Sequence, residues 1–241
     1  MLLKTHGIVF RAIKYSESSL IIDLYTREKG LKKYIISGVR SPKAKVHANL
    51  FQVMTLLDIV GYDRPDKDLH RLKEVRSAFI YQHIPFNVVK SASGMFMLEV
   101  ARKTILESEP NPELFDFLFS TFRFLDQTNN STANIHLLFL IQLSAYLGFT
   151  PDLEQTSDRP FFDLQEGYFT RAVPAHSHYL DPEFSKLLAQ FIASNYEEAH
   201  QIELSSQQRQ DLLNRLLEYY RLHIDNFPTI NAHTILQEIL S

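Results

Sequence analysis

The first 80 residues consist of short apolar runs separated by turn signals, a pattern that predicts β-strands and no long helix. Arg27-Glu28-Lys29-Gly30 is typical of a hairpin turn between two of these runs. The fourth run is apolar at both alternating sets of positions, so we expect both of its faces to be covered. The predicted strands are residues 7–14, 20–26, 31–37, 53–61 and 69–79.

Five antiparallel strands within about 80 residues match the size of an OB-fold, a small barrel that closes its sheet and hides most strand edges. We therefore predict an OB-fold β-barrel at the amino-terminal end.

From residue 84 onward the apolar residues recur at helical spacing. Three helix starts carry a capping side chain, and two of them have proline in the first turn: Asn111-Pro112-Glu113, Asp181-Pro182-Glu183 and Ser205-Ser206. Gly148 is the expected stop of the third helix. The predicted helices are 88–107, 111–125, 132–147, one from 182, 206–224 and 232–240.

A loop with a small β-hairpin interrupts the helices at 149–180. In it, Phe161-Phe162-Asp163-Leu164 turns at Glu166-Gly167 into Tyr168-Phe169-Thr170. The predicted fold class is α+β: an OB-fold barrel over residues 1–80, then an all-helical domain over 81–241 with the hairpin inserted.

Length and composition agree with two soluble globular domains, because the chain has 241 residues, 45% of them hydrophobic and 22% charged. Residues 127–151 carry no charge, but several Asn, Ser and Thr residues interrupt them, which favours a buried helix over a membrane span. The amino-terminal residues lack the apolar core of a signal peptide. Cysteine is absent, which excludes disulfides, thiolate metal sites and cysteine nucleophiles, and we expect a cytoplasmic protein.

The net charge of −3 hides an asymmetry along the chain. Residues 1–80 hold 15 Lys and Arg against 8 Asp and Glu, whereas residues 81–241 hold 10 against 20. A basic barrel joined to an acidic helical domain indicates nucleic acid as the partner of the first, and proteins or plain solvation for the second.

The basic residues of the barrel concentrate in one stretch, residues 29–45, that contains no acid. In an OB-fold, a basic groove neutralises phosphates while aromatic rings stack on unpaired bases. The alternative is that lysines on a strand edge only prevent sheet aggregation. The predicted nucleic-acid-binding residues are Lys29, Lys32, Lys33, Tyr34, Arg40, Lys43 and Lys45.

No motif for covalent chemistry occurs in the sequence. The seven glycines form no Gly-rich phosphate loop, and neither a Gly-x-Ser-x-Gly turn nor a His-Glu-x-x-His helix is present. His176 and His178 could contact one metal ion, but no third ligand has a telling spacing, and a polar loop is the simpler interpretation. We therefore predict a protein that is not an enzyme and that needs no cofactor or metal.

Four segments, in this order, resemble the amino-terminal signature of the RecO family of bacterial recombinational-repair mediators. Two later segments, Leu72-Lys73-Glu74-Val75 and the helix-to-loop junction at 146–153, are similar to that family as well. The four are Thr5-His6-Gly7-Ile8-Val9, Tyr15-Ser16-Glu17-Ser18-Ser19, Leu24-Tyr25-Thr26-Arg27-Glu28-Lys29-Gly30 and Ser37-Gly38-Val39-Arg40-Ser41-Pro42-Lys43.

The resemblance implies a DNA repair and recombination mediator with an OB-fold and a helical carboxy-terminal domain. It implies binding to single-stranded and double-stranded DNA, annealing of complementary strands, and a cytoplasmic, nucleoid-associated location. The implied partners are RecR, single-strand-binding protein and, indirectly, RecA. Many family members carry a four-cysteine zinc site where this chain has residues 154–159, so we expect that metal to be lost here. Residues 230–236 also lack the basic residues that family members carry near their carboxy-terminal end.

The family implies that the helical domain binds the acidic, apolar-ended tail of single-strand-binding protein. A terminal carboxylate needs a cation beside an apolar pocket. The candidates are Arg102, Lys103, Arg123, Arg171, Arg215 and Arg221.

Two rival functions remain on the sequence alone. In the first, the acidic helical domain is the working surface and the barrel docks protein instead of DNA. The second, a metal-dependent nuclease, would need clustered carboxylates, which the barrel segment does not offer.

Overall fold

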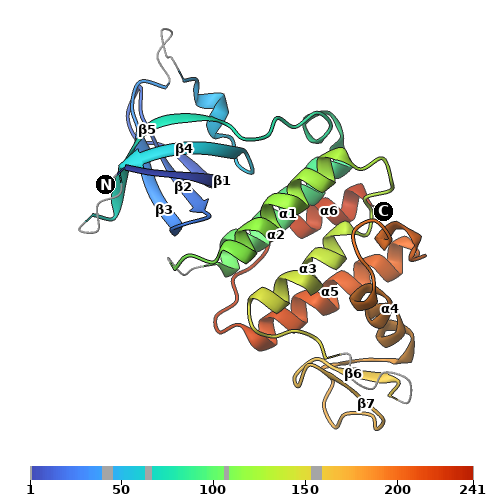
Figure 1. Ribbon diagram of the computed structural model, residues 1–241. Helices are drawn as coiled ribbons and strands as arrows, with labels where there is room; N and C mark the ends of the chain where they lie inside the picture. Colours follow the sequence, from blue (N-terminus) through green and yellow to red (C-terminus); the bar gives the residue numbers. More distant parts are fainter. Residues whose placement is uncertain (1, 40–45, 63–66, 106–108, 153–158, 241) are drawn as a thin grey trace. The chain divides into compact units, whose positions relative to one another are not determined.

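The computed structural model describes residues 2–39, 46–62, 67–105, 109–152 and 159–240 (Figure 1). Its contacts divide the chain into two compact units. The first comprises the chain up to residue 82 together with residues 105–126, and the second comprises residues 83–104 together with the chain from residue 127. The predicted domain boundary at residue 80 stays a prediction, because each compact unit combines two separate segments of the chain.

The first unit contains a closed barrel in the strand order β1-β2-β3-β5-β4, with β4 paired back to β1. The β3–β5 pair is parallel and the other pairs are antiparallel. This is the arrangement of an OB-fold, so the predicted barrel is confirmed. The expectation that all five strands pair antiparallel is wrong for β3 and β5. The elements are β1 (Leu2–Lys14), β2 (Leu20–Thr26), β3 (Gly30–Ile36), the short 3-10 helix η1 (Ala48–Phe51), β4 (Leu56–Tyr62) and β5 (Leu69–Ser77).

Successive side chains of a strand point to opposite faces, so every second residue of each strand points into the barrel interior. On β2, Ile22 and Leu24 are fully buried in the core. The ring of Tyr34 on β3 joins the same core. Gly61 on β4 makes room for that ring, because a Cβ atom at position 61 would lie 2.8 Å from it.

Helix α2 (Pro112–Gln127) belongs to the barrel's compact unit, although it lies 35 residues beyond the end of β5. The ring of Tyr25 on β2 stacks on Phe10, with centroids 5.4 Å apart, and meets Phe115 of α2 at 6.0 Å. Burial raises the pKa of Tyr25 to about 12. Phe115 of α2 is thus part of the first unit's core.

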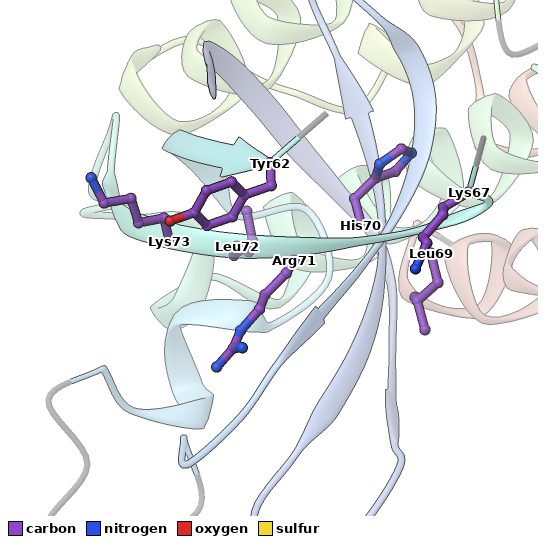
Figure 2. Close-up of a pocket in the computed structure, with 7 residues that line it drawn as sticks. All are labelled: Tyr62, Lys67, Leu69, His70, Arg71, Leu72 and Lys73. Carbon is purple, nitrogen blue, oxygen red and sulfur yellow. The ribbon is translucent and has the colours of Figure 1, made fainter. Parts of the chain in front are cut away.

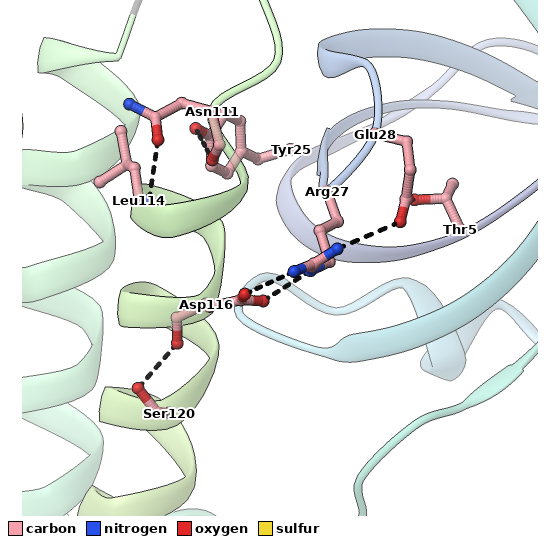
Figure 3. Close-up of polar contacts among 8 residues, drawn as sticks. All are labelled: Thr5, Tyr25, Arg27, Glu28, Asn111, Leu114, Asp116 and Ser120. Atoms are coloured by element: carbon pink, nitrogen blue, oxygen red, sulfur yellow. Dashed lines mark hydrogen bonds and ion pairs between the residues drawn. The ribbon is translucent and has the colours of Figure 1, made fainter.

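A bidentate ion pair joins the β2–β3 turn to α2 (Figure 3). Arg27 donates from Nε and Nη2 to the two carboxylate oxygens of Asp116, each at 2.8 Å. Hydrogen bonding to Arg27 lowers the pKa of the Asp116 carboxyl. The predicted helix start is confirmed, because Asn111 Oδ1 accepts the backbone N–H of Leu114 at 3.0 Å.

The second unit is built around a central apolar helix, α3, which contacts α1, α4 and α5. Nine of its 12 residues are buried. Across the described residues, no helix has both the length and the apolar character needed to cross a membrane. The helices are α1 (Val88–Thr104), α3 (Ile135–Tyr146), α4 (Pro182–Ala193), α5 (Ser206–His223) and α6 (Ala232–Ile239), with the short 3-10 helices η2 (Ile84–Phe86) and η4 (Ala199–Gln201).

Two further predicted helix starts are confirmed. The Asp181 side chain accepts the N–H of Phe184 at 3.0 Å and caps α4. Ser205 and Gln208 form a reciprocal capping box at the start of α5. The helix predicted from residue 132 instead begins at Ile135.

The predicted hairpin is confirmed as β6 (Phe161–Asp163) and β7 (Tyr168–Thr170), with Gly167 in the left-handed region at φ +78. A third short strand that the sequence did not predict, β8 (Tyr179–Leu180), completes the order β7-β6-β8. The predicted fold class, an OB-fold barrel followed by a helical domain with a small sheet, is confirmed.

His136 of α3 is a polar side chain in the core of the second unit. It is fully buried, and its ring meets Phe96 of α1 edge-on at 5.9 Å. Burial lowers the pKa of His136 to about 3, and the charge of Arg209 adds to this effect. The imidazole is therefore neutral in the folded protein at neutral pH.

Replacing His136 by Leu should make the stability less dependent on pH. Below pH 6.5 the unfolded chain binds a proton at this ring, whereas the folded chain does not until about pH 3. Folding stability should therefore fall with decreasing pH by up to about 1.4 kcal/mol per unit from this residue alone. Urea unfolding of wild type and His136→Leu at pH 7 and pH 5 measures the difference, with exposed His47→Gln as control. Equal pH dependence of wild type and His136→Leu would contradict the prediction.

Candidate nucleic-acid interface

The predicted basic stretch does not form one continuous face in the described residues. Lys29 lies in the β2–β3 turn, and Lys32 and Lys33 are consecutive on β3, so their side chains leave opposite faces of the strand. Lys33 is exposed and Lys32 is half-buried. Arg40, Lys43 and Lys45 lie outside the described residues.

The prediction that Tyr34 offers a stacking surface is wrong. Its side chain is 1% exposed, within the barrel core, where its ring meets His70 at 5.5 Å and covers Gly61. Because Tyr34 follows Lys33 on an extended strand, an outward Lys33 requires an inward Tyr34. The ring therefore stabilises the barrel and is not available to a base.

A basic groove lies instead where β4 ends and β5 begins (Figure 2). It has a volume of about 650 Å³. Tyr62 lies opposite Arg71 in the β4–β5 register. Figure 2 shows Arg71 on the opposite side of the β5 ribbon from His70, which agrees with Arg71 being exposed and His70 buried. The lining residues are Tyr62, Lys67, Leu69, His70, Arg71, Leu72 and Lys73.

The groove combines positive charge with an exposed aromatic ring. Lys67, Arg71 and Lys73 are all exposed, and Tyr62 is 38% exposed. The described lining residues include no carboxylate, although Glu74 lies 3.4 Å from the Lys73 ammonium. Such a surface can neutralise phosphates and offer a ring face to an unpaired base.

Parallel pairing brings Lys33 to the border of this groove. Lys33 pairs with Leu69, and Ile35 pairs with Arg71. The outer face of β3, where one predicted residue, Lys33, is exposed, is therefore a neighbour of the groove, although no β3 residue is among the described lining residues. In OB-folds, oligonucleotides bind at the face of the second and third strands and at the loop between the fourth and fifth strands. Lys67, which lines the groove, belongs to that loop in this chain.

Sequence reasoning missed Tyr62, Lys67, Arg71 and Lys73 as site residues. A signal was present in the predicted last strand, because Arg71 and Lys73 alternate with the apolar Leu72. The position of Tyr62 beside them depends on the β4–β5 register, which includes a bulge next to Gly61. The sequence carries no local indication of that register.

The six predicted partner-binding cations are dispersed over both units. Arg123 is on α2 in the first unit, 5.3 Å above the ring of Phe79. In the second unit, Lys103 is hydrogen-bonded to Glu99 and to the Thr229 carbonyl. The others are Arg102 at the end of α1, the exposed Arg171 after β7, and the exposed Arg215 and Arg221 on α5.

The geometry at His176 and His178 favours a hydrogen-bonded loop. His176 Nδ1 accepts the backbone N–H of His178 at 3.2 Å, and its Nε2 lies 3.1 Å from Asp163. Both ring nitrogens of His176 are thus engaged, which leaves no lone pair for a metal ion. His178 Nδ1 lies 2.6 Å from Glu218. Among the described residues, no group of three potential ligands is arranged to hold a metal.

Comparison with known proteins gives a consistent family. The family model described as Recombination protein O N terminal matches residues 1–81, and the model Recombination protein O C terminal matches residues 85–229. The chain is 34% identical to the DNA repair protein RecO of Phocaeicola vulgatus over 241 residues, which cover 100% of both chains. It is 35% identical to that of Bacteroides fragilis and 37% identical to that of Christiangramia forsetii, in each case over 240 residues and 99% of both chains.

The first model covers the five strands of the barrel, and the second covers the helices α1 to α5 with the small sheet. With both segments matched, and with relatives aligned over nearly their whole length, the chain belongs to the RecO family.

Proposed function

We propose that this chain acts in DNA repair and recombination as a mediator that binds single-stranded and double-stranded DNA. In this role it anneals complementary strands and helps to load RecA onto strands coated by single-strand-binding protein. The observation that carries the proposal is the basic groove beside Tyr62, on the barrel of a chain that belongs to the RecO family. The relatives' name, DNA repair protein, supports the same role.

The proposed mechanism involves no covalent step. Arg71, Lys73 and Lys67 neutralise phosphates and release the counterions condensed on DNA. Tyr62 stacks on a base through a π-face that every base possesses, so the grip is independent of sequence. A grip of this kind suits a protein that must hold any two complementary strands during annealing.

The proposed protein partners are RecR and the carboxy-terminal tail of single-strand-binding protein, with RecA contacted indirectly. A cytoplasmic, nucleoid-associated location is part of the same proposal. For the acidic tail, Arg102 and Arg221 are the better candidates in the second unit, because Lys103 and Arg215 each already contact a glutamate at 2.6 and 2.8 Å. A planar guanidinium can hold the terminal carboxylate by two hydrogen bonds.

The rival function remains a scaffold whose barrel docks protein instead of DNA. The exposed cations of the groove, with no described carboxylate in its lining, favour DNA. The strength and the salt dependence of DNA binding separate the two functions.

Replacing Arg71 and Lys73 by Ala should weaken single-stranded DNA binding and flatten its salt dependence. Each phosphate contact that is lost should reduce the log–log slope of affinity against salt by about 0.7. Fluorescence anisotropy with a labelled oligonucleotide at several salt concentrations measures the slope. Lys4→Ala/Lys14→Ala is the control, because it removes the same two charges from β1, which pairs with neither β3 nor β5. An unchanged slope in Arg71→Ala/Lys73→Ala would favour the scaffold.

Replacing Tyr62 by Ala should weaken binding without changing the salt slope, since stacking releases no counterions. A lost stacking contact costs about 1–3 kcal/mol per base. Tyr62→Phe keeps the ring and should retain most of the affinity. The same titration measures both variants, and equal loss in Tyr62→Phe and Tyr62→Ala would show that the ring does not stack on a base.

The tail of single-strand-binding protein should bind saturably to the full chain. Its apolar end needs a hydrophobic contact and its terminal carboxylate needs a cation, so removing the last apolar residue should abolish binding. Isothermal titration with the complete and the truncated tail peptide tests this. Equal binding of the two peptides, or none of either, would count against the proposed partner.

A further inference from the structure

A pocket of about 560 Å³ lies where β8, the start of α4 and α5 meet in the second unit. Tyr179, Leu180 and Phe184 supply apolar surface to its lining. Asp181 and Asp211 supply carboxylates, from the cap of α4 and from α5. The pocket thus offers apolar walls and negative charge together, the reverse of the basic groove on the barrel.

The charge of this pocket is not cancelled by the cation that lines it. Arg215 Nη1 donates to Glu218 at 2.8 Å, so its charge is matched by a carboxylate outside the lining. Asp211 accepts only the neutral Gln207 amide, at 3.0 Å, and Asp181 accepts the Phe184 N–H. Within the part of the chain that the structure describes, neither aspartate has an ion-pair partner.

Both aspartates retain unused acceptor capacity, because a carboxylate has about four lone-pair sites. They are available to a cationic group of a ligand.

A second hollow of about 630 Å³ lies on the same two helices. Glu183 of α4 accepts from the Gln208 side chain of α5 at 2.6 Å, and both residues line it. Glu198 and Glu203 add two carboxylates against one cation, Lys186. Carboxylates therefore also line the second hollow, which is formed by α4, the start of α5 and the segment that joins them. We call the two hollows together the α4–α5 face.

We propose that the α4–α5 face docks a basic segment of a partner protein and that one Lys or Arg side chain of this segment enters the Tyr179–Phe184 pocket. A long basic side chain has the two chemical properties that the pocket requires. Its aliphatic stem packs on apolar surface while its charged end reaches a carboxylate. The aromatic rings add attraction to a cation placed over their faces.

Charge complementarity selects this occupant over the alternatives. An acidic peptide or a phosphate would meet Asp181 and Asp211 on entry, and like charges at an interface are unfavourable. The pocket therefore also argues against Arg215 as the anchor of an acidic tail. Docking at this face is a function beyond DNA binding, and it does not depend on the groove at Arg71.

The test uses the full chain and a fluorescent peptide in which Lys alternates with Ala. Wild type should bind it saturably. Asp181→Asn and Asp211→Asn should each weaken binding about threefold, and the double variant about tenfold, as expected for exposed charge pairs. Asparagine is isosteric and caps a helix as well as aspartate does, so the fold is retained. Circular dichroism checks the fold, and fluorescence anisotropy measures binding.

Two controls separate the pocket from general attraction to an acidic protein. Asp225→Asn removes the same charge from an exposed position after α5 and should leave binding unchanged. A peptide with diaminopropionic acid in place of Lys keeps the charge but lacks the stem, and it should bind more weakly. Single-stranded DNA binding of the Asp181→Asn/Asp211→Asn variant should equal that of wild type, which keeps this test independent of the proposed function.

The proposal is overturned by any of three results. These are no saturable binding to wild type, equal loss in Asp225→Asn and Asp211→Asn, or equal affinity for the long-stemmed and the short-stemmed peptide.

Discussion

The parallel pairing of β3 with β5 is the contact on which the barrel and its groove both depend. It closes the sheet, so that Ile22, Leu24 and Tyr34 face a sealed interior. The same pairing sets Lys33 beside Leu69 and Ile35 beside Arg71 on the outer face. Because alternate residues leave opposite faces of a strand, one register determines both the core and the basic surface.

Features that depend on residues close together in the sequence could be predicted, whereas features that depend on contacts between distant residues could not. Turns, caps and strand runs are local, and Asn111, Asp181 and Ser205 cap helices as predicted. The groove was missed because it joins β4 and β5 through a register that no local pattern encodes. The error at Tyr34 was different in kind. Tyr34 was grouped with the neighbouring lysines because it lies among them in the sequence. Successive side chains of a strand point to opposite faces, however, and the Tyr34 ring therefore lies inside the barrel.

The two compact units carry surfaces of opposite character, as the charge asymmetry of the sequence indicates. The barrel has exposed cations and a ring at Tyr62. The second unit has carboxylates around apolar walls at the α4–α5 face. DNA and a basic peptide would not compete for the same surface, because the basic groove repels the peptide and the acidic α4–α5 face repels DNA. The proposed DNA site and the proposed peptide site are therefore separate surfaces of the chain.

The most direct test of the central claim maps where single-stranded DNA contacts the full chain. A bromouracil-substituted oligonucleotide, photo-crosslinked to the protein, identifies the contacted peptides by mass spectrometry. Crosslinks should be concentrated in the peptides that contain Tyr62 and Arg71, and they should be lost at high salt. Crosslinks confined to α4 and α5, or distributed evenly over both units, would contradict it.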